Sequence, residues 1–247
     1  MSEHHHHHHH APAIPVTMNM SFAIAVSANL LFTLAEAILA LEANSASLLG
    51  DAGHNFSDVL GLLLAWGATY LVSRASGRDY SYGYRRTTIL AALLNAMLLL
   101  LAAGYIAVQS LEKFYNPVAP SETLIILVAL VGIAVNGGTA LLFMKSSKGD
   151  LNLKGAFLHL AYDALISAGV VVGGVVILFT GWLWVDPLMG LLITAVIVYG
   201  TWALLRDSIN LILDAVPQGI DRQGIVSYLS ALPGVTQVHD VHIWAMS

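Results

Sequence analysis

Six long apolar stretches, separated by short polar segments, constrain this 247-residue chain more than any other feature. A helix needs about 20 predominantly apolar residues to cross a hydrocarbon core about 30 Å thick, and each stretch is long enough for one crossing. Charged residues make up only 10% of the chain, against about 25% in soluble domains, which excludes a water-soluble globule. We therefore predict an all-α polytopic membrane protein. Its predicted spans are Met20–Leu41, Ser47–Ser73, Thr87–Leu111, Leu124–Met144, Ala156–Phe179 and Trp182–Leu205.

The basic residues set the expected orientation of these spans. Nine of the ten Lys and Arg residues follow the second, fourth or sixth span, and Lys113 alone lies on the other side. Because basic residues in short loops are retained in the cytoplasm, we expect both termini of a six-helix domain, residues 20–206, to be cytoplasmic. A signal peptide is the disfavoured alternative for the first span, since no Lys or Arg precedes it.

The charge of the chain restricts its partners. A net charge of −5 leaves no broad basic surface for nucleic acid. The ionisable residues inside the spans are carboxylates and imidazoles, without Lys or Arg, so the interior should attract a cation. With no Cys in the chain, a metal site must use His, carboxylate or carbonyl ligands. The residues concerned are Glu36, Asp51, His54, Asp58, His159, Asp163 and Asp186.

Two His-Asp pairs carry the sharpest prediction. His54 and Asp58 are four residues apart, and so are His159 and Asp163, so each pair occupies one helix face. Two such helices facing each other offer two nitrogens and two oxygens, a tetrahedral set that suits Zn²⁺. We therefore predict a shared metal site for which metal ions and protons compete. A hydrogen-bonded structural pair is the alternative for either copy alone.

The remaining buried acids lack a partner at this spacing. For Glu36, Asp51 and Asp186 we favour structural or entrance roles, and Asp186 precedes a proline at an expected helix start. The fifth span also carries three small residues for which we expect close packing against a neighbouring helix. They are Gly169, Gly173 and Gly174.

Several motifs together resemble the cation diffusion facilitator family, whose members export zinc and related divalent metals in exchange for protons. The resemblance runs from about Ser21 onward and includes both His-Asp pairs. The segments that carry it are Ser47–Asp58, Tyr82–Thr88, His159–Asp163, Asp186–Pro187 and Val238–Trp244.

The resemblance implies a function and an assembly. His54, Asp58, His159 and Asp163 would be the transport-site ligands, in the version of the site that the family uses for zinc and cadmium. The protein would be a homodimer in a bacterial inner membrane that alternates between inward and outward openings. Zinc is then the transported substrate, protons and the lipid bilayer are further partners, and no organic cofactor is expected.

The family also implies a cytoplasmic α/β domain of ferredoxin-like shape after the sixth span. We expect residues 207–247 to be an incomplete part of it, with a helix over Asp221–Leu232 and a strand over Val235–Trp244. His239 resembles a position that binds metal in some members, which makes it a candidate secondary ligand. The N-terminal residues 1–19 contain the run His4–His10, which is either a purification tag or a native metal-capturing tail.

Other functions fit parts of the sequence. A passive divalent-cation channel could use the same ligands, although four strong ligands hold an ion too well for fast conduction. A membrane metal sensor would bind metal without flux. A membrane metalloenzyme is disfavoured, because the His-Glu-x-x-His motif is missing and all four predicted ligands are protein groups.

Overall fold

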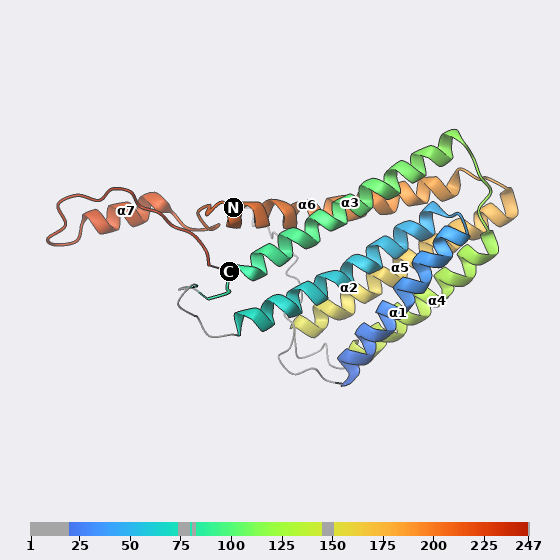
Figure 1. Ribbon diagram of the computed structural model, residues 1–247, viewed down its shortest axis with the longest axis horizontal. Coiled ribbons are helices and arrows are strands. Elements are labelled where there is room, and N and C mark those ends of the chain that lie inside the picture. Colours follow the sequence, from blue (N-terminus) through green and yellow to red (C-terminus); the bar gives the residue numbers. More distant parts are fainter. Residues whose placement is uncertain (1–19, 74–79, 81–82, 145–150, 247) are drawn as a thin grey trace, which may run out of the picture. The chain divides into compact units, whose positions relative to one another are not determined.

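The computed structural model describes residues 20–73, 80, 83–144 and 151–246, without the side chains of residues 20–26, 142–143, 151–153 and 156. These residues form seven helices, shown in chain order in Figure 1. Their bounds are α1 (Met20–Glu42), α2 (Ala46–Val72), α3 (Thr87–Tyr115), α4 (Glu122–Met144), α5 (Leu151–Thr180), α6 (Val185–Ile212) and α7 (Arg222–Ser230). Some predictions concern residues outside the described part of the chain: His4–His10, Arg74, Arg78, Tyr82, Lys145 and Lys148.

Five of the helices are long and apolar enough to cross a membrane: α2, α3, most of α4, most of α5, and α6. They match five of the predicted spans to within a few residues. The predicted first span coincides with α1, but the side chains of residues 20–26 are outside the described part, so the sixth crossing stays a prediction. The helices turn large apolar side chains such as Leu31 and Leu165 outward, as a lipid-facing surface requires.

The chain divides into two compact units. Unit 1 comprises residues 1–59 and 101–197, and unit 2 comprises residues 60–100 and 198–247. Helices α2, α3 and α6 each contribute a part to both units, whereas α1, α4 and α5 belong to unit 1 and α7 belongs to unit 2. All four predicted metal ligands are residues of unit 1.

Small residues bring the helices of unit 1 together. Helix α5 packs along α4, and α1 packs against α4 (Figure 1). A Cβ atom added at Gly174 of α5 would lie 2.9 Å from Cγ1 of Ile126 on α4, closer than side chains approach each other. One added at Gly132 of α4 would lie 3.0 Å from both Phe32 of α1 and Ser167 of α5. The close packing expected at Gly174 is therefore present.

The C-terminal segment differs from its prediction. Helix α7 (Arg222–Ser230) lies inside the predicted helix, and Asp221 caps it by accepting a hydrogen bond from the backbone N–H of Gln223. The predicted strand over Val235–Trp244 is wrong: residues 235–246 form no strand, and no strand occurs elsewhere in the described part of the chain. An extended segment becomes a strand only when a neighbour accepts its backbone hydrogen bonds, and alternation of side chains does not supply that neighbour.

Candidate metal centre

Helices α2 and α5 place their polar residues opposite each other in consecutive pairs. Asp51 faces Ser167, His54 faces Asp163, and Asp58 faces His159. A step of three or four residues forward along α2 is matched by four residues backward along α5, as in antiparallel helices. The i, i+4 spacing of each predicted pair thus puts both of its members on the contact face.

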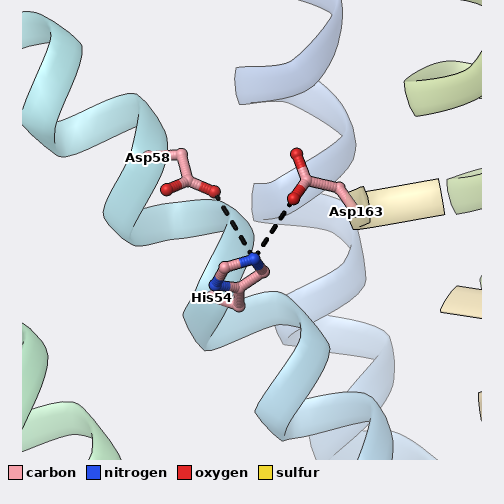
Figure 2. Close-up of side chains that lie close together, drawn as sticks. All are labelled: His54, Asp58 and Asp163. Atoms are coloured by element: carbon pink, nitrogen blue, oxygen red, sulfur yellow. Dashed lines mark hydrogen bonds and ion pairs between the residues drawn. The ribbon is translucent and has the colours of Figure 1, made fainter. Parts of the chain in front are cut away.

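The four predicted ligands lie together, and we call them the quartet: His54, Asp58, His159 and Asp163. Nε2 of His54 lies 3.2 Å from Oδ1 of Asp163 and 3.9 Å from Oδ2 of Asp58 (Figure 2). Nε2 of His159 lies 3.3 Å from Oδ2 of Asp58 and 3.8 Å from Oδ2 of Asp163. Each imidazole therefore contacts both carboxylates, so nitrogen and oxygen alternate around the group.

These spacings are close to those of a tetrahedral metal site. Ligand atoms about 2.0–2.1 Å from Zn²⁺ lie about 3.3 Å from one another at the corners of a tetrahedron. The four N–O distances of the quartet range from 3.2 to 3.9 Å. One ligand atom from each of His54, Asp58 and Asp163 falls within 4.8 Å of the other two. His159 lies outside this group of three, so its ring would have to move closer to the other ligands to complete a four-ligand site.

Exposure falls steadily along the paired helices. The side chain of His159 is 44% exposed and that of Asp58 is 27% exposed, whereas His54 is 19% and Asp163 only 4% exposed. The next pair, Asp51 and Ser167, is completely buried, and Leu48 and Val170 beyond it are buried apolar residues. The quartet is therefore accessible from the His159 end and closed at the other.

The charge of the quartet favours a divalent cation. No Lys or Arg among the described residues forms an ion pair with it, and its ion-pair contacts there are between its own members. Two carboxylates in a poorly solvated position repel each other unless a positive charge lies between them. A divalent cation neutralises both, and neutral imidazoles complete its coordination.

The buried acids outside the quartet have partners that the sequence analysis missed. Glu36 accepts a hydrogen bond from Asn55, and Asp51 accepts one from Ser167. Ser167 lies four residues after Asp163, so extending the i, i+4 pattern by one turn would have found it.

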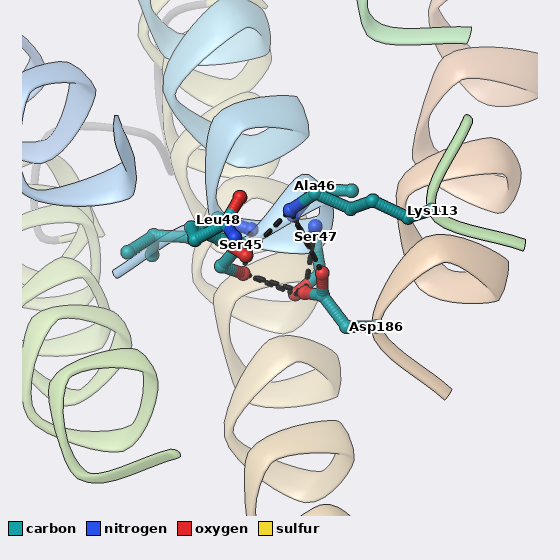
Figure 3. A network of polar contacts seen from close by, with 7 residues as sticks. Ser45, Ala46, Ser47, Leu48, Lys113 and Asp186 are labelled. Carbon is teal, nitrogen blue, oxygen red and sulfur yellow. Dashed lines mark hydrogen bonds and ion pairs between the residues drawn. The ribbon is translucent and has the colours of Figure 1, made fainter. Parts of the chain in front are cut away.

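Asp186 lies in the first turn of α6 and binds the start of α2 (Figure 3). Its carboxylate accepts hydrogen bonds from the hydroxyls of Ser45 and Ser47 and from the backbone N–H groups of Ala46 and Ser47. Nζ of Lys113 lies 3.6 Å away. Asp186 thus has a structural role, and the one basic residue outside the predicted cytoplasmic face is engaged with it.

The candidate secondary ligand, His239, is a residue of unit 2. Its side chain is 72% exposed, and Nδ1 lies 3.0 Å from Oδ2 of Asp240. A single neighbouring carboxylate does not make a metal site, and no larger group of metal-ligating side chains surrounds His239 in the described residues. Its secondary role stays a prediction.

The apolar helices and the carboxylate-imidazole cluster between two of them define an integral membrane protein of the cation-transporter class. The family model described as the cation efflux transmembrane domain matches residues 22–213. The chain therefore belongs to the cation efflux family, which confirms the resemblance drawn from its motifs.

The chain is similar in sequence to several bacterial metal transporters. The cadmium, cobalt and zinc/H(+)-K(+) antiporter of Bacillus subtilis is 33% identical over 218 residues, which cover 87% of this chain and 70% of that protein. The metal cation efflux system protein CzcD of Cupriavidus metallidurans is 34% identical over 227 residues, 92% of this chain and 72% of its own length. The zinc transporter ZitB of Escherichia coli is 31% identical over 215 residues, which cover 86% of this chain and 69% of that protein. These relatives are transporters and not enzymes, which excludes the metalloenzyme alternative.

Proposed function

We propose that this protein exports zinc from the cytoplasm in exchange for protons, with the quartet as the transport site. The observation that carries the proposal is that each of two imidazole nitrogens lies 3.2–3.9 Å from both carboxylates between α2 and α5. This donor set suits zinc, and cadmium and cobalt are further candidates because relatives are named for them.

Exchange for protons follows from the same four groups. Carboxylates and imidazoles bind metal only when deprotonated, so metal binding releases protons and proton binding releases metal. The relative from Bacillus subtilis is named as an antiporter that uses protons, which supports the same coupling here. A proton gradient directed inward would then drive metal outward.

The proposal includes an arrangement in the membrane. We place six spans in residues 20–206, with α1 as the first, both termini in the cytoplasm and the chain in a bacterial inner membrane. The accessible end of the quartet, at His159, then faces the cytoplasm, because α2 ends and α5 begins beside the basic segments. Residues 207–247 would be part of a cytoplasmic α/β domain, and two copies of the chain would form a homodimer.

Flux measurement in proteoliposomes tests the proposed function. The full chain is reconstituted, a pH gradient is imposed, and Zn²⁺ movement is followed for the wild type, Asp163→Ala and Asp207→Ala. We expect gradient-driven flux in the wild type and in Asp207→Ala, whose carboxylate is exposed on α6, but none in Asp163→Ala.

Three results would contradict the proposal in different ways. Flux that ignores the pH gradient would indicate a passive channel. Zinc binding without any flux would indicate a metal sensor. Zinc binding that is equally strong in Asp163→Ala and the wild type would remove the quartet from the mechanism.

A further inference from the structure

A second polar cluster lies one helical turn from the quartet, within unit 1. Its two acids, Glu36 and Asp51, are 0% exposed, and we call them the inner carboxyl pair. Nδ2 of Asn55 donates to Oε2 of Glu36 at 3.0 Å, and the hydroxyl of Ser167 donates to Oδ2 of Asp51 at 2.7 Å. Helices α1, α2 and α5 thus all contribute to this cluster.

Each acid of the pair keeps one oxygen without a donor. Oε1 of Glu36 and Oδ1 of Asp51 are buried, and no described residue donates a hydrogen bond to them. The two acids are neighbours, because Asn55, which donates to Glu36, lies one helical turn after Asp51 on α2. Two ionised carboxylates are both acceptors and cannot bond to one another. One proton placed between them supplies the missing donor.

The charges around the pair lead to the same result. Neither acid takes part in an ion pair with a basic residue in the described part of the chain. His54 lies one helical turn after Asp51 on α2, and Ser167, which donates to Asp51, lies one turn after Asp163 on α5. A metal ion bound by the quartet would balance the charges of its carboxylates. Two adjacent negative charges at membrane depth are costly, and one shared proton removes one of them.

The donor set fits a proton better than a metal ion. Hard cations such as Ca²⁺ and Mg²⁺ take about six or more oxygen ligands. Here Asn55 and Ser167 turn their N–H and O–H groups toward the carboxyl groups, and only two carboxyl oxygens remain. Two oxygens are too few for such an ion but sufficient to share one proton.

We propose that the inner carboxyl pair, held by Asn55 and Ser167 one turn beyond the quartet, is a proton site separate from the metal site. Glu36 and Asp51 share one proton there while the quartet holds the metal ion. The role of this proton in transport rests on the proposed exchange of metal for protons. The presence of the proton on the inner carboxyl pair does not depend on that exchange.

Infrared spectroscopy of the full chain detects the proton directly. The sample is measured at neutral pH with saturating Zn²⁺, because carboxylates that ligate zinc are deprotonated and do not contribute to the carbonyl band of protonated carboxyl groups. We expect that band in the wild type and its loss in Glu36→Gln. The control is Glu42→Gln, which removes an exposed carboxylate from the end of the same helix and should keep the band.

A second variant tests the proposal even if Glu36→Gln does not fold. Asp51→Asn removes the other acid of the inner carboxyl pair and should also abolish the band. A zinc-saturated wild type without the band, or a band that Glu36→Gln leaves unchanged, would overturn the proposal.

The flux assay separates failure of this inference from failure of the proposed function. Gradient-driven zinc flux in a protein without the band would support the proposed transport function and contradict the proton site. A band together with flux that ignores the gradient would support the proton site and contradict the proposed exchange of metal for protons. The number of protons exchanged per zinc ion should fall in Glu36→Gln, and an unchanged number would show that the proton is not transported.

Discussion

The carboxylate of Asp186 accepts a hydrogen bond of 2.7 Å from the backbone N–H of Ala46, 140 positions earlier in the chain. A residue at the start of α6 therefore serves as the N-terminal cap of α2, the helix that carries half of the quartet. Helix starts have backbone N–H groups without intrahelical partners, and a negative charge there is favourable. The cap connects the two helices at the end opposite the accessible side of the quartet.

Replacing Asp186 by Ala should destabilise the protein strongly. The change removes the cap, worth about 0.5–2 kcal/mol, and leaves the largely buried ammonium of Lys113 without its carboxylate, for a total of about 3–5 kcal/mol. Thermal unfolding in detergent measures the effect. Asp207→Ala, an exposed acid on the same helix, should change the unfolding temperature little, and equal effects in the two variants would contradict this account.

A second substitution separates the charge of Lys113 from the cap. Because part of the loss in Asp186→Ala comes from an unpaired buried ammonium, the double variant Asp186→Ala, Lys113→Met should be more stable than Asp186→Ala alone. The same unfolding assay tests this. If the double variant is the less stable of the two, Lys113 contributes mainly through its hydrogen bond to the backbone carbonyl of Asn44.

Gly174→Ala should also destabilise the bundle. The added methyl group would meet Ile125 and Ile126 at 3.0 and 2.9 Å, and overpacking of this kind costs about 1–3 kcal/mol. The matched control is Gly137→Ala on α4, where an added Cβ has nothing within 4 Å. Alanine favours helix over glycine, so Gly137→Ala should be neutral or stabilising by up to about 1 kcal/mol. Similar unfolding temperatures for Gly174→Ala and Gly137→Ala would contradict the close packing at Gly174.

Zinc affinity should decrease as the pH falls. Both imidazoles and both carboxylates of the quartet must be deprotonated to coordinate zinc, so protons compete with the metal and each binding event releases protons at low pH. Titration calorimetry in buffers of different ionisation enthalpy, from about pH 8 to about pH 6, measures affinity and proton release together. An affinity that does not depend on pH would separate zinc binding from these four groups.

The exposed ion pair of unit 2 should contribute little. Arg86 and Asp214 form a hydrogen-bonded salt bridge, but their side chains are 53% and 48% exposed. Solvent and salt screen such a pair, so Arg86→Ala should cost no more than about 1 kcal/mol in the unfolding assay. A loss comparable to that of Asp186→Ala would show that exposure is a poor guide to the strength of ion pairs in this protein.

Local patterns were enough to predict most of the helices and the residues of the quartet. A span of about 20 apolar residues must satisfy its backbone hydrogen bonds internally and therefore becomes a helix wherever it lies. The i, i+4 spacing in turn fixes which face holds His54 with Asp58 and which holds His159 with Asp163. Both inferences depend on residues close together in the sequence, and for this reason they needed no tertiary information.

The amino-acid sequence by itself thus determined a helical membrane protein with two His-Asp faces. Only the tertiary structure decided what those faces and the other buried acids meet. It paired Asp51 with Ser167 and Asp186 with the start of α2, and it left residues 235–246 without the partner that a strand requires. The physical reason is that these contacts join residues more than a hundred positions apart or depend on a neighbouring strand, and local spacing carries no information about either.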